Sequence, residues 1–324
     1  MSKSNKVFFL TMIIGTLITM SSNNWISMWM GLELNMLSFM PLIKSKNKSS
    51  SEASMIYFLI QSMSSMILLF SIIYCMGGKE MQLFVSLGYT VLMIKLGSAP
   101  FHMWFPEMMS KMKWEPCILL MTWQKLAPLM MISNLKSDIL MYMAVMASTI
   151  LGAIGGLNQT SLRKIMSYSS INHLGWMLAI NKMQNNWSIY WIMYTIMSAT
   201  ICYMFNKYNM FFINQINDLN MTNTEKITYA ISMLSLGGLP PFLGFLPKWI
   251  AIQTLMWNNM YTIVMIMTMM SLITLFFYMR SMMSMLINLS DATIWTKTNS
   301  NLNMNIMILS INFSLPIIMM MNIK

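Results

Sequence analysis

Apolar side chains occur along this chain in long blocks that are separated by short polar connections. Each block has roughly the 20 residues that an α-helix needs to cross the hydrocarbon core of a bilayer. We count eleven blocks, and the connections leave no room for a soluble domain. The pattern predicts an all-α polytopic membrane protein of about eleven transmembrane helices, with residues 1–324 forming one transmembrane domain. The blocks fall near 7–20, 25–43, 53–76, 81–103, 116–134, 138–156, 164–180, 187–205, 228–257, 260–287 and 304–321.

Two of the blocks are interrupted by the same motif, G-x-x-P-F. The fourth block contains GSAPF, with Gly97 and Pro100, and the ninth contains GLPPF, with Gly238, Pro240 and Pro241. Glycine and proline break a helix, and the freed backbone groups are tolerated inside a membrane only against protein or a water-filled cavity. A simple proline kink is the alternative for either motif alone. Two motifs at matching positions favour a functional break.

The spacing of the two motifs indicates an internal repeat. The fourth and ninth blocks are five spans apart, and an odd number of spans inverts the second copy in the membrane. Gly- or Pro-interrupted spans at matching positions of two halves point to the ion path of a transporter. We therefore predict two inverted five-helix repeats with broken helices in spans four and nine. They cover about 7–134 and 138–287, and a final helix follows at about 304–321.

Composition and charge support a membrane protein and give its orientation. Charged residues make up 9% of the chain and hydrophobic residues 56%. Apart from three lysines deep in the apolar blocks, thirteen lysines and arginines fall on the side of the N-terminus and four on the opposite side. The positive-inside rule then puts the N-terminus in the cytoplasm or its mitochondrial equivalent, the matrix. The net charge of +11 is a topology signal, because its charges are scattered over short loops, and nucleic-acid binding is not expected.

The chain carries 47 methionines, spread over every block. An AT-rich mitochondrial genome accounts for this excess better than a copper-binding stripe does. Translation inside the organelle would also account for the lack of a targeting segment. The first block ends in Met20 and polar residues instead of a cleavage site, so we expect it to be retained.

Neither the cysteines nor the histidines predict a metal or haem site. The cysteines lie singly in three different apolar blocks, at Cys75, Cys117 and Cys202, without the spacing of metal ligands. The two histidines, His102 and His173, lie in dissimilar settings, which disfavours a bis-histidine haem. We expect neither a metal nor a cofactor in this chain.

Four charged residues lie near the middle or the broken end of an apolar block: Glu33, Lys95, Lys125 and Lys248. Each costs roughly 2.5–3.5 kcal/mol at mid-bilayer, so we predict that they serve to move charge. A lysine removed from water can exchange a proton near neutral pH. Glu33 is the only carboxylate in the interior of a predicted span and is the expected partner of Lys95.

His173 lies on a polar helical face with Ser169, Asn172 and Trp176, at the spacing i, i+3, i+4, i+7. An imidazole can relay protons between lysines, although a lone buried histidine is as often a structural group. His102 lies nearer the membrane edge, where a structural role is favoured.

Five segments together resemble the subunit 2 family of mitochondrial NADH:ubiquinone oxidoreductase, respiratory complex I, in its insect form. They are WMGLELNMLSFMPL, LGSAPFHMWFPE, TWQKLAPLM, GAIGGLNQTSLRKIMSYSSINHLGWM and SLGGLPPFLGFLPKW. The family belongs to the antiporter-like membrane subunits, which usually have fourteen helices in two inverted repeats. Animal forms resemble that plan with three N-terminal helices missing.

The resemblance implies a central hydrophilic axis of one glutamate and three lysines. Glu33, Lys95, Lys125 and Lys248 stand at the matching motif positions, and His173 matches a central histidine. It also implies that this chain carries no redox centre. FMN, the iron–sulfur clusters, NADH and ubiquinone are expected in other subunits.

The function implied is proton translocation in the inner mitochondrial membrane, coupled to electron transfer elsewhere in the complex. The N-terminus would face the matrix and the C-terminus the intermembrane space. The expected partners are other membrane-arm subunits and lipids, with cardiolipin a candidate that rests on no local motif. Two alternatives stay open: a structural subunit with a silent axis, and a stand-alone cation/proton antiporter.

Overall fold

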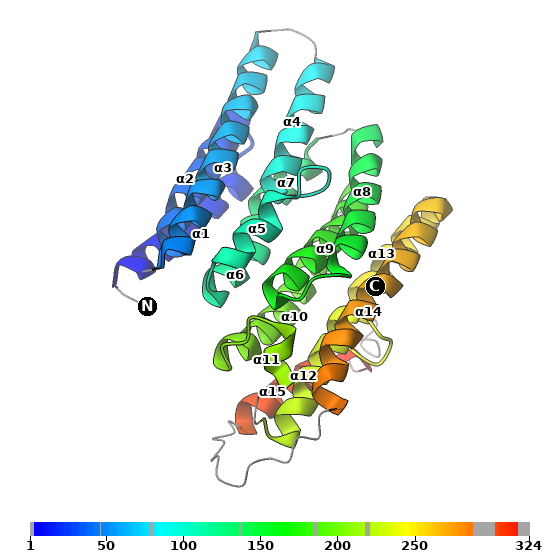
Figure 1. Cartoon of the computed structure of the whole chain (residues 1–324). Helices are drawn as coiled ribbons and strands as arrows, with labels where there is room; N and C mark the ends of the chain where they lie inside the picture. The colour runs from blue at the N-terminus through cyan, green and yellow to red at the C-terminus, as the bar shows by residue number, and fades with distance from the viewer. Residues whose placement is uncertain are drawn as a thin grey trace. The chain divides into compact units, whose positions relative to one another are not determined.

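The computed structural model describes residues 3–45, 47–77, 81–135, 138–183, 187–217, 221–287 and 302–316. These residues are helical apart from turns and one isolated β-bridge between Ser161 and Phe212. The chain divides into two compact units, Met1–Ser148 and Thr149–Lys324. The prediction of an all-helical protein is confirmed (Figure 1).

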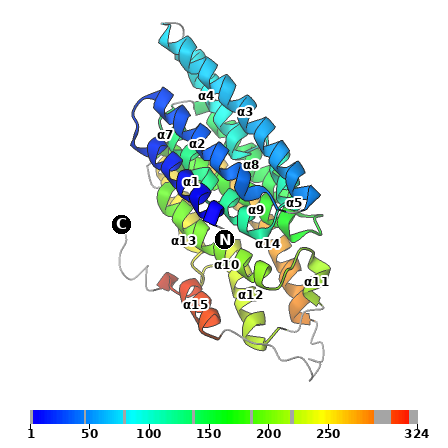
Figure 2. The ribbon, with the colours of Figure 1, turned by 90° about the vertical axis from the view of Figure 1, so that its left-hand side faces the viewer.

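The first unit is built from long helices followed by short ones. In it α1 packs along α2, while α3 contacts α2, α4 and α5, and α7 contacts α1 and α4 (Figure 2). The helices are α1 (Lys3–Ser21), α2 (Trp25–Ile43), α3 (Lys48–Met76), α4 (Met81–Leu96), α5 (Trp104–Lys111), α6 (Trp114–Met121), the 3-10 helix η1 (Trp123–Lys125) and α7 (Leu126–Ser133). The next helix, α8 (Asp138–Gly156), crosses the boundary between the units.

The second unit is organised around α12 and α13. In it α12 contacts α10, α14 and α15, while α13 contacts α9, α10 and α14. The helices are α9 (Leu162–Met183), α10 (Trp187–Lys207), α11 (Ile213–Asn217), α12 (Asn223–Gly237), α13 (Phe245–Trp257), α14 (Tyr261–Ile287) and α15 (Leu302–Asn312).

Several helices are long and apolar enough to cross a membrane. Among the described residues five meet both criteria: Trp25–Ile43, Lys48–Met76, Ile139–Gly156, Trp187–Lys207 and Tyr261–Met283. Asn5–Ser21 and Gln82–Leu96 are apolar but shorter. The outward side of α3 exposes large apolar side chains such as Met63 and Phe70, as expected of a surface that meets lipid. The chain is therefore a multi-pass membrane protein.

Helix boundaries follow the apolar blocks closely, with two corrections. The blocks 25–43 and 138–156 coincide with α2 and α8, and helices end at both G-x-x-P-F motifs. Residues 104–111 and 213–217, expected to lie in connections, form α5 and α11. The block 116–134, expected to be one helix, is divided into α6, η1 and α7. Of the last block, residues 317–321 lie outside the described part.

The division of the block 116–134 has a local cause. Pro128 has no N–H to donate to the carbonyl of Gln124 four residues earlier, which weakens a regular α-helix at that turn. The hydroxyl of Thr122 donates to the carbonyl of Ile118 at 2.7 Å, a bond that often bends helices. The chain passes through a 3-10 turn here, and Lys125 is its last residue.

Two glycines allow α1 and α2 to approach closely. A Cβ added at Gly31 would lie 2.5 Å from Thr19 Cγ2 and 2.8 Å from the carbonyl oxygen of Gly15, and one at Gly15 would lie 3.0 Å from the carbonyl oxygen of Gly31. Small residues at such crossings let helix backbones pack directly in a membrane. This contact positions α2, which carries Glu33.

We expect Gly31→Ala to destabilise the full-length chain by about 1–3 kcal/mol, because the new methyl group meets backbone atoms that cannot move aside. Gly88→Ala is the matched control. It also lies within a helix, but its Cβ would only reach Leu135 Cδ1 at 3.5 Å. Both changes raise helix propensity equally. The midpoint of thermal unfolding in detergent checks this, and equal midpoints for the two variants would contradict the packing argument.

Candidate functional site

The two buried lysines of the first unit both lie where a helix is interrupted. Lys95 is in the last turn of α4, and Lys125 ends η1. Their side chains are 6% and 1% exposed. The chain turns away from α4 at Gly97, whose φ of +66° favours glycine. The last carbonyls of a helix have no partner within it, and here Gln61 Nε2 donates to the carbonyl of Lys95 at 3.2 Å.

A polar network links the helices around these lysines. Tyr57 Oη donates to Gln124 Oε1 at 3.2 Å, and Gln124 Nε2 donates to Asn35 Oδ1 at 3.0 Å. The network thus joins α3, η1 and α2. A cavity with about 20 Å³ of space for water lies against these three side chains and both lysines. That volume is enough for a single water molecule.

Glu33 faces this site without closing the expected ion pair. Its carboxylate interacts electrostatically with Lys95 and Tyr57. Within the described part of the chain, no direct ion pair joins Glu33 to Lys95, and the buried Glu33 Oε1 has no hydrogen-bond partner. Lys125 Nζ lies 5.7 Å from the centre of the Phe105 ring, a cation–π contact that partly replaces water.

In the second unit, the interruption after α12 holds Lys248 directly. The helix ends in a left-handed cap at Gly238, with φ of +77°. Lys248, on α13 and 6% exposed, donates from Nζ to the carbonyl of Gly237 at 2.7 Å. A Cβ at Gly238 would lie 2.8 Å from Lys248 Cδ. Glycine is therefore required twice at this position, for the backbone conformation and for the space that the lysine takes.

A groove of about 350 Å³ runs beside this interruption. Lys248, Thr268 and Ser271 are its polar lining residues, and Trp176, residues 237–240 and apolar residues of α13 and α14 complete it. Leu272 on its rim is 62% exposed. The groove therefore extends from Lys248 to the exposed side of α14.

His173 is buried among aromatic hydroxyls. Its Nδ1 lies 2.8 Å from Tyr190 Oη, and its ring centre lies 4.9 Å from that of Tyr194. The polar face predicted on this helix, which includes Ser169 and Asn172, is buried in α9. His102 follows the interruption after α4, and its Nδ1 lies 3.3 Å from the carbonyl oxygen of Pro100.

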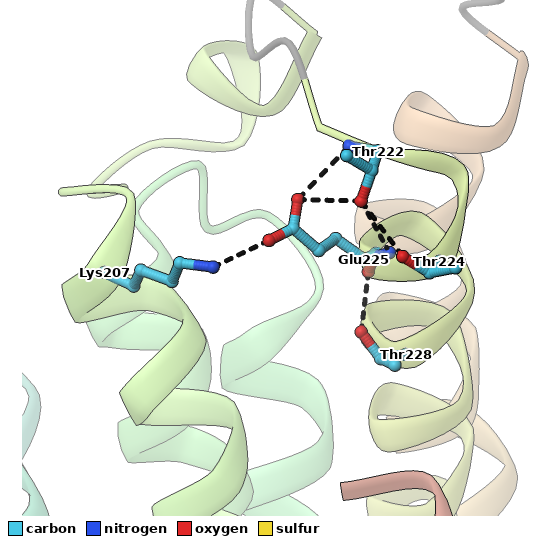
Figure 3. A network of polar contacts seen from close by, with 5 residues as sticks. All are labelled: Lys207, Thr222, Thr224, Glu225 and Thr228. Carbon is cyan, nitrogen blue, oxygen red and sulfur yellow. Dashed lines mark hydrogen bonds and ion pairs between the residues drawn. The ribbon is translucent and has the colours of Figure 1, made fainter. Parts of the chain in front are cut away.

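A further polar cluster, not predicted from the sequence, lies at the start of α12. Lys207, at the end of α10, donates from Nζ to Glu225 Oε1 at 2.6 Å (Figure 3). Thr222 and Glu225 form a capping box, in which Glu225 Oε2 accepts from Thr222 N at 3.2 Å and from Thr222 Oγ1 at 3.0 Å. The spacing T-x-x-E was the signal for the cap. The cluster holds the first turn of the helix whose last carbonyl binds Lys248.

Comparisons with known proteins identify the family of the chain. Residues 22–274 match the model of a family described as NADH:quinone oxidoreductase/Mrp antiporter, TM. The NADH-ubiquinone oxidoreductase chain 2 of Anopheles gambiae is 46% identical, over 96% of this chain and 94% of that protein. The chain 2 protein of Mus musculus is 42% identical, over 85% of this chain and 84% of that protein.

Two solved structures share the fold. One is respiratory complex I from Thermus thermophilus with bound aureothin, with a TM-score of 0.79 at 20% identity over 87% of this chain and 70% of the matched chain. The other is the Mrp complex from Dietzia sp. DQ12-45-1b, with a TM-score of 0.77 at 17% identity over 87% of this chain and 59% of that one. Fold and site together define an antiporter-like membrane subunit.

The chain belongs to the NADH-ubiquinone oxidoreductase chain 2 family, and it is a membrane subunit of NADH:ubiquinone oxidoreductase. The resemblance read from the sequence motifs is thereby confirmed. Among the described residues, no group of three or more His, Cys, Asp and Glu side chains is arranged to hold a metal ion.

The Glu225 cluster makes stability depend on acid pH. Burial raises the pKa of the Glu225 carboxyl, but hydrogen bonds from Lys207, Tyr208 and Thr222 outweigh it and hold the pKa below its ordinary value of 4.5. A carboxyl with a lowered pKa stabilises the folded chain above its ordinary pKa, and this contribution is lost as the pH falls through the lowered value.

We therefore expect Glu225→Gln to reduce the free energy of unfolding by about 1–3 kcal/mol at neutral pH. The difference from the unmutated chain should shrink below about pH 4.5. Denaturant unfolding of both chains in detergent, at several pH values from about 3.5 to about 7.5, would measure this difference in the free energy of unfolding. The control is Glu107→Gln, which removes an exposed pair with Lys111 and should cost less than about 1 kcal/mol. A pH-independent difference for Glu225→Gln would contradict the ionic contribution.

Proposed function

We propose that this chain translocates protons across the inner mitochondrial membrane, driven by NADH:ubiquinone electron transfer in other subunits of the complex. The observation that carries the proposal is the contact of Lys248 with the interrupted helix. Its ammonium donates to the Gly237 carbonyl at 2.7 Å, and among the described residues it has no carboxylate partner. A neutral carbonyl stabilises the protonated lysine without locking the proton in an ion pair.

The same physical logic applies to Lys95, in the last turn of α4. The carboxyl end of a helix carries a partial negative charge, which favours a nearby cation by roughly 0.3–1 kcal/mol, and up to about 2 kcal/mol when partly buried. That is less than the cost of burying a charge at mid-bilayer. Such a lysine can gain or lose its proton when a nearby charge changes.

The nearby charge in the first unit is Glu33. Its carboxylate interacts with Lys95 without a direct ion pair, so a small movement of α2 or α4 would change the interaction in either direction. A closer Glu33 would favour the protonated lysine, and a more distant one would favour proton release. In our proposal the energy of electron transfer drives this movement.

The proton-transfer residues in our proposal are Glu33, Lys95, Lys125, His173 and Lys248. Gly97, Pro100, Gly238, Pro240 and Pro241 provide the helix breaks. The small cavity near Lys95 and Lys125 would supply water between these groups. Movement from the matrix to the intermembrane space follows from the family. FMN, iron–sulfur clusters, NADH and ubiquinone would be held by other subunits, which are the partners of this chain.

The finer architecture is part of the same proposal. Eleven spans would form two inverted five-helix repeats at about 7–134 and 138–287, followed by a last helix at about 304–321. The N-terminus would face the matrix and the C-terminus the intermembrane space. Support comes from the two interruptions, after α4 and after α12, each of which has a buried lysine beside it.

We expect Lys125→Met, in the assembled complex reconstituted into vesicles, to lower the number of protons moved per electron pair. Methionine fills the same space but cannot carry a proton. Lys248→Met should have the same effect, whereas Lys113→Met, at an exposed position, should have none. Proton uptake and NADH oxidation are measured together. Full electron transfer with unchanged stoichiometry in both buried-lysine variants would favour a structural subunit with a silent axis.

A further inference from the structure

The second unit contains a group of buried tyrosines that the proposed axis does not use. Tyr190 and Tyr194 lie on α10, Tyr229 on α12 and Tyr278 on α14. None is more than 1% exposed. Phenylalanine would fill the same space on these three neighbouring helices without burying a hydroxyl group. Packing alone therefore does not explain the four tyrosines.

At the inner end, the tyrosine hydroxyls reach His173. Tyr190 Oη lies 2.8 Å from His173 Nδ1. The neighbouring Tyr194, one helical turn further along α10, has its ring centre 4.9 Å from that of the imidazole, and its side chain faces Ser170. The histidine that the family places at the centre of the axis thus has two phenols beside it.

Toward the end of the unit that carries Lys207, the polar groups continue. Tyr278 interacts with Tyr190 and Tyr194 and faces the hydroxyl of Ser169, the residue before Ser170. Tyr229 faces Ser281, which lies one turn beyond Tyr278 on α14. We call Tyr190, Tyr194, Tyr229 and Tyr278, with Ser169, Ser170 and Ser281, the hydroxyl ladder.

The outer end of the ladder is the cluster of Figure 3. Glu225 precedes Tyr229 by one helical turn on α12, so the two are about 6 Å apart along the axis. The Glu225 carboxylate accepts a hydrogen bond from Lys207, whose side chain is 22% exposed (Figure 3). Tyr208 lies close enough to interact with the same carboxylate. The ladder therefore leads from the interior to a charged pair that reaches the surface of the unit.

The distance covered is that of a half-channel. Leu162, the first residue of α9, donates its N–H to the carbonyl of Phe211 at the Lys207 end. His173 lies eleven residues further along α9, which is roughly 16 Å at 1.5 Å per residue. This is about half the thickness of a bilayer's hydrocarbon core.

Two members of the ladder have unused hydrogen-bonding capacity. Within the described residues, the buried Oη atoms of Tyr229 and Tyr278 have no hydrogen-bond partner. A buried polar group left unpaired costs about 1–3 kcal/mol. A phenol is both a donor and an acceptor, so these two can bond to water molecules and pass a proton along.

We infer that the hydroxyl ladder is a proton-access path from the Lys207–Glu225 pair to His173. The inference rests on the proposed function and adds the route by which a proton enters the second unit. Each hydroxyl or intervening water accepts a proton on its oxygen and releases its own proton to the next group. One proton thus enters at Glu225, one is received by the imidazole of His173, and each phenol is left neutral.

The test is the double variant Tyr229→Phe/Tyr278→Phe in the assembled complex, reconstituted into vesicles. Among the described residues neither phenol oxygen has a hydrogen-bond partner, so each change removes one oxygen and keeps the packing of the rings. We expect NADH-driven proton flux to fall about tenfold, since a positioned proton relay contributes at least 10²-fold and water can replace part of it. The solvent deuterium isotope effect on flux should rise, a change that a purely structural role would not produce.

Tyr89→Phe is the matched control. Tyr89 is 1% exposed and its Oη also has no hydrogen-bond partner among the described residues, but it lies on α4 in the first unit. Its flux and isotope effect should match those of the unmutated complex. The single variant Tyr229→Phe, with a smaller loss expected, serves if the double variant does not assemble.

The outcomes separate the inference from the proposed function. Unchanged flux in the tyrosine variants, together with a loss in Lys125→Met, would overturn the ladder and leave proton translocation standing. Unchanged flux in all of these variants would overturn both. A loss in Tyr89→Phe equal to that of the double variant would also overturn the ladder, because the effect would then follow from any buried phenol.

Discussion

The second unit depends on one hydrogen bond, from the ammonium of Lys248 to the carbonyl of Gly237 at 2.7 Å. A bilayer offers no water to a buried charge, and a continuous helix offers no free carbonyl. Ending α12 at Gly237 provides the carbonyl, and the positive φ of Gly238 lets the chain turn within one residue. The energetic penalty of a broken helix and that of a buried lysine therefore offset each other at a single place.

Everything around this contact serves to hold the broken helix in position. At its start, the capping box of Thr222 and Glu225 and the ion pair with Lys207 fix the first turn of α12 against α10. After its end, Gly244 packs so closely on the carbonyl of Ser235 that no Cβ could fit there. In the first unit the contact of Gly15 with Gly31 has the same role for α2. The groups that we propose to exchange protons are thus carried by helices that close contacts hold in position.

Much of the candidate site could be predicted, because charges and helix breakers stand out in an apolar sequence. Lys95, Lys125 and Lys248 were identified on that basis. So were the interruptions near Gly97 and Gly238, where α4 and α12 end. The 3-10 turn that ends at Lys125 was not predicted, although Pro128 interrupts the hydrogen bonding of a regular helix there. The ion pair of Lys207 with Glu225 and the tyrosines near His173 were missed for a different reason. Lysines at loop ends and tyrosines in membrane helices are common, so their presence in a sequence indicates no particular site. Only the residues that they contact in the folded chain identify them as part of one.

The sequence by itself determined most of the helical segments, the breaks at the two G-x-x-P-F motifs and the family to which the chain belongs. A bilayer forces apolar segments into helices, and five motifs together are specific. Tertiary structure decided which group meets which. The partner of Lys248 is a backbone carbonyl, a group that every residue has and that no sequence pattern marks. Glu33 was the expected ion-pair partner of Lys95, yet it stays close without a direct contact. Such distances depend on how α2, α3 and α4 pack, because residues tens of positions apart along the chain meet only in the folded structure.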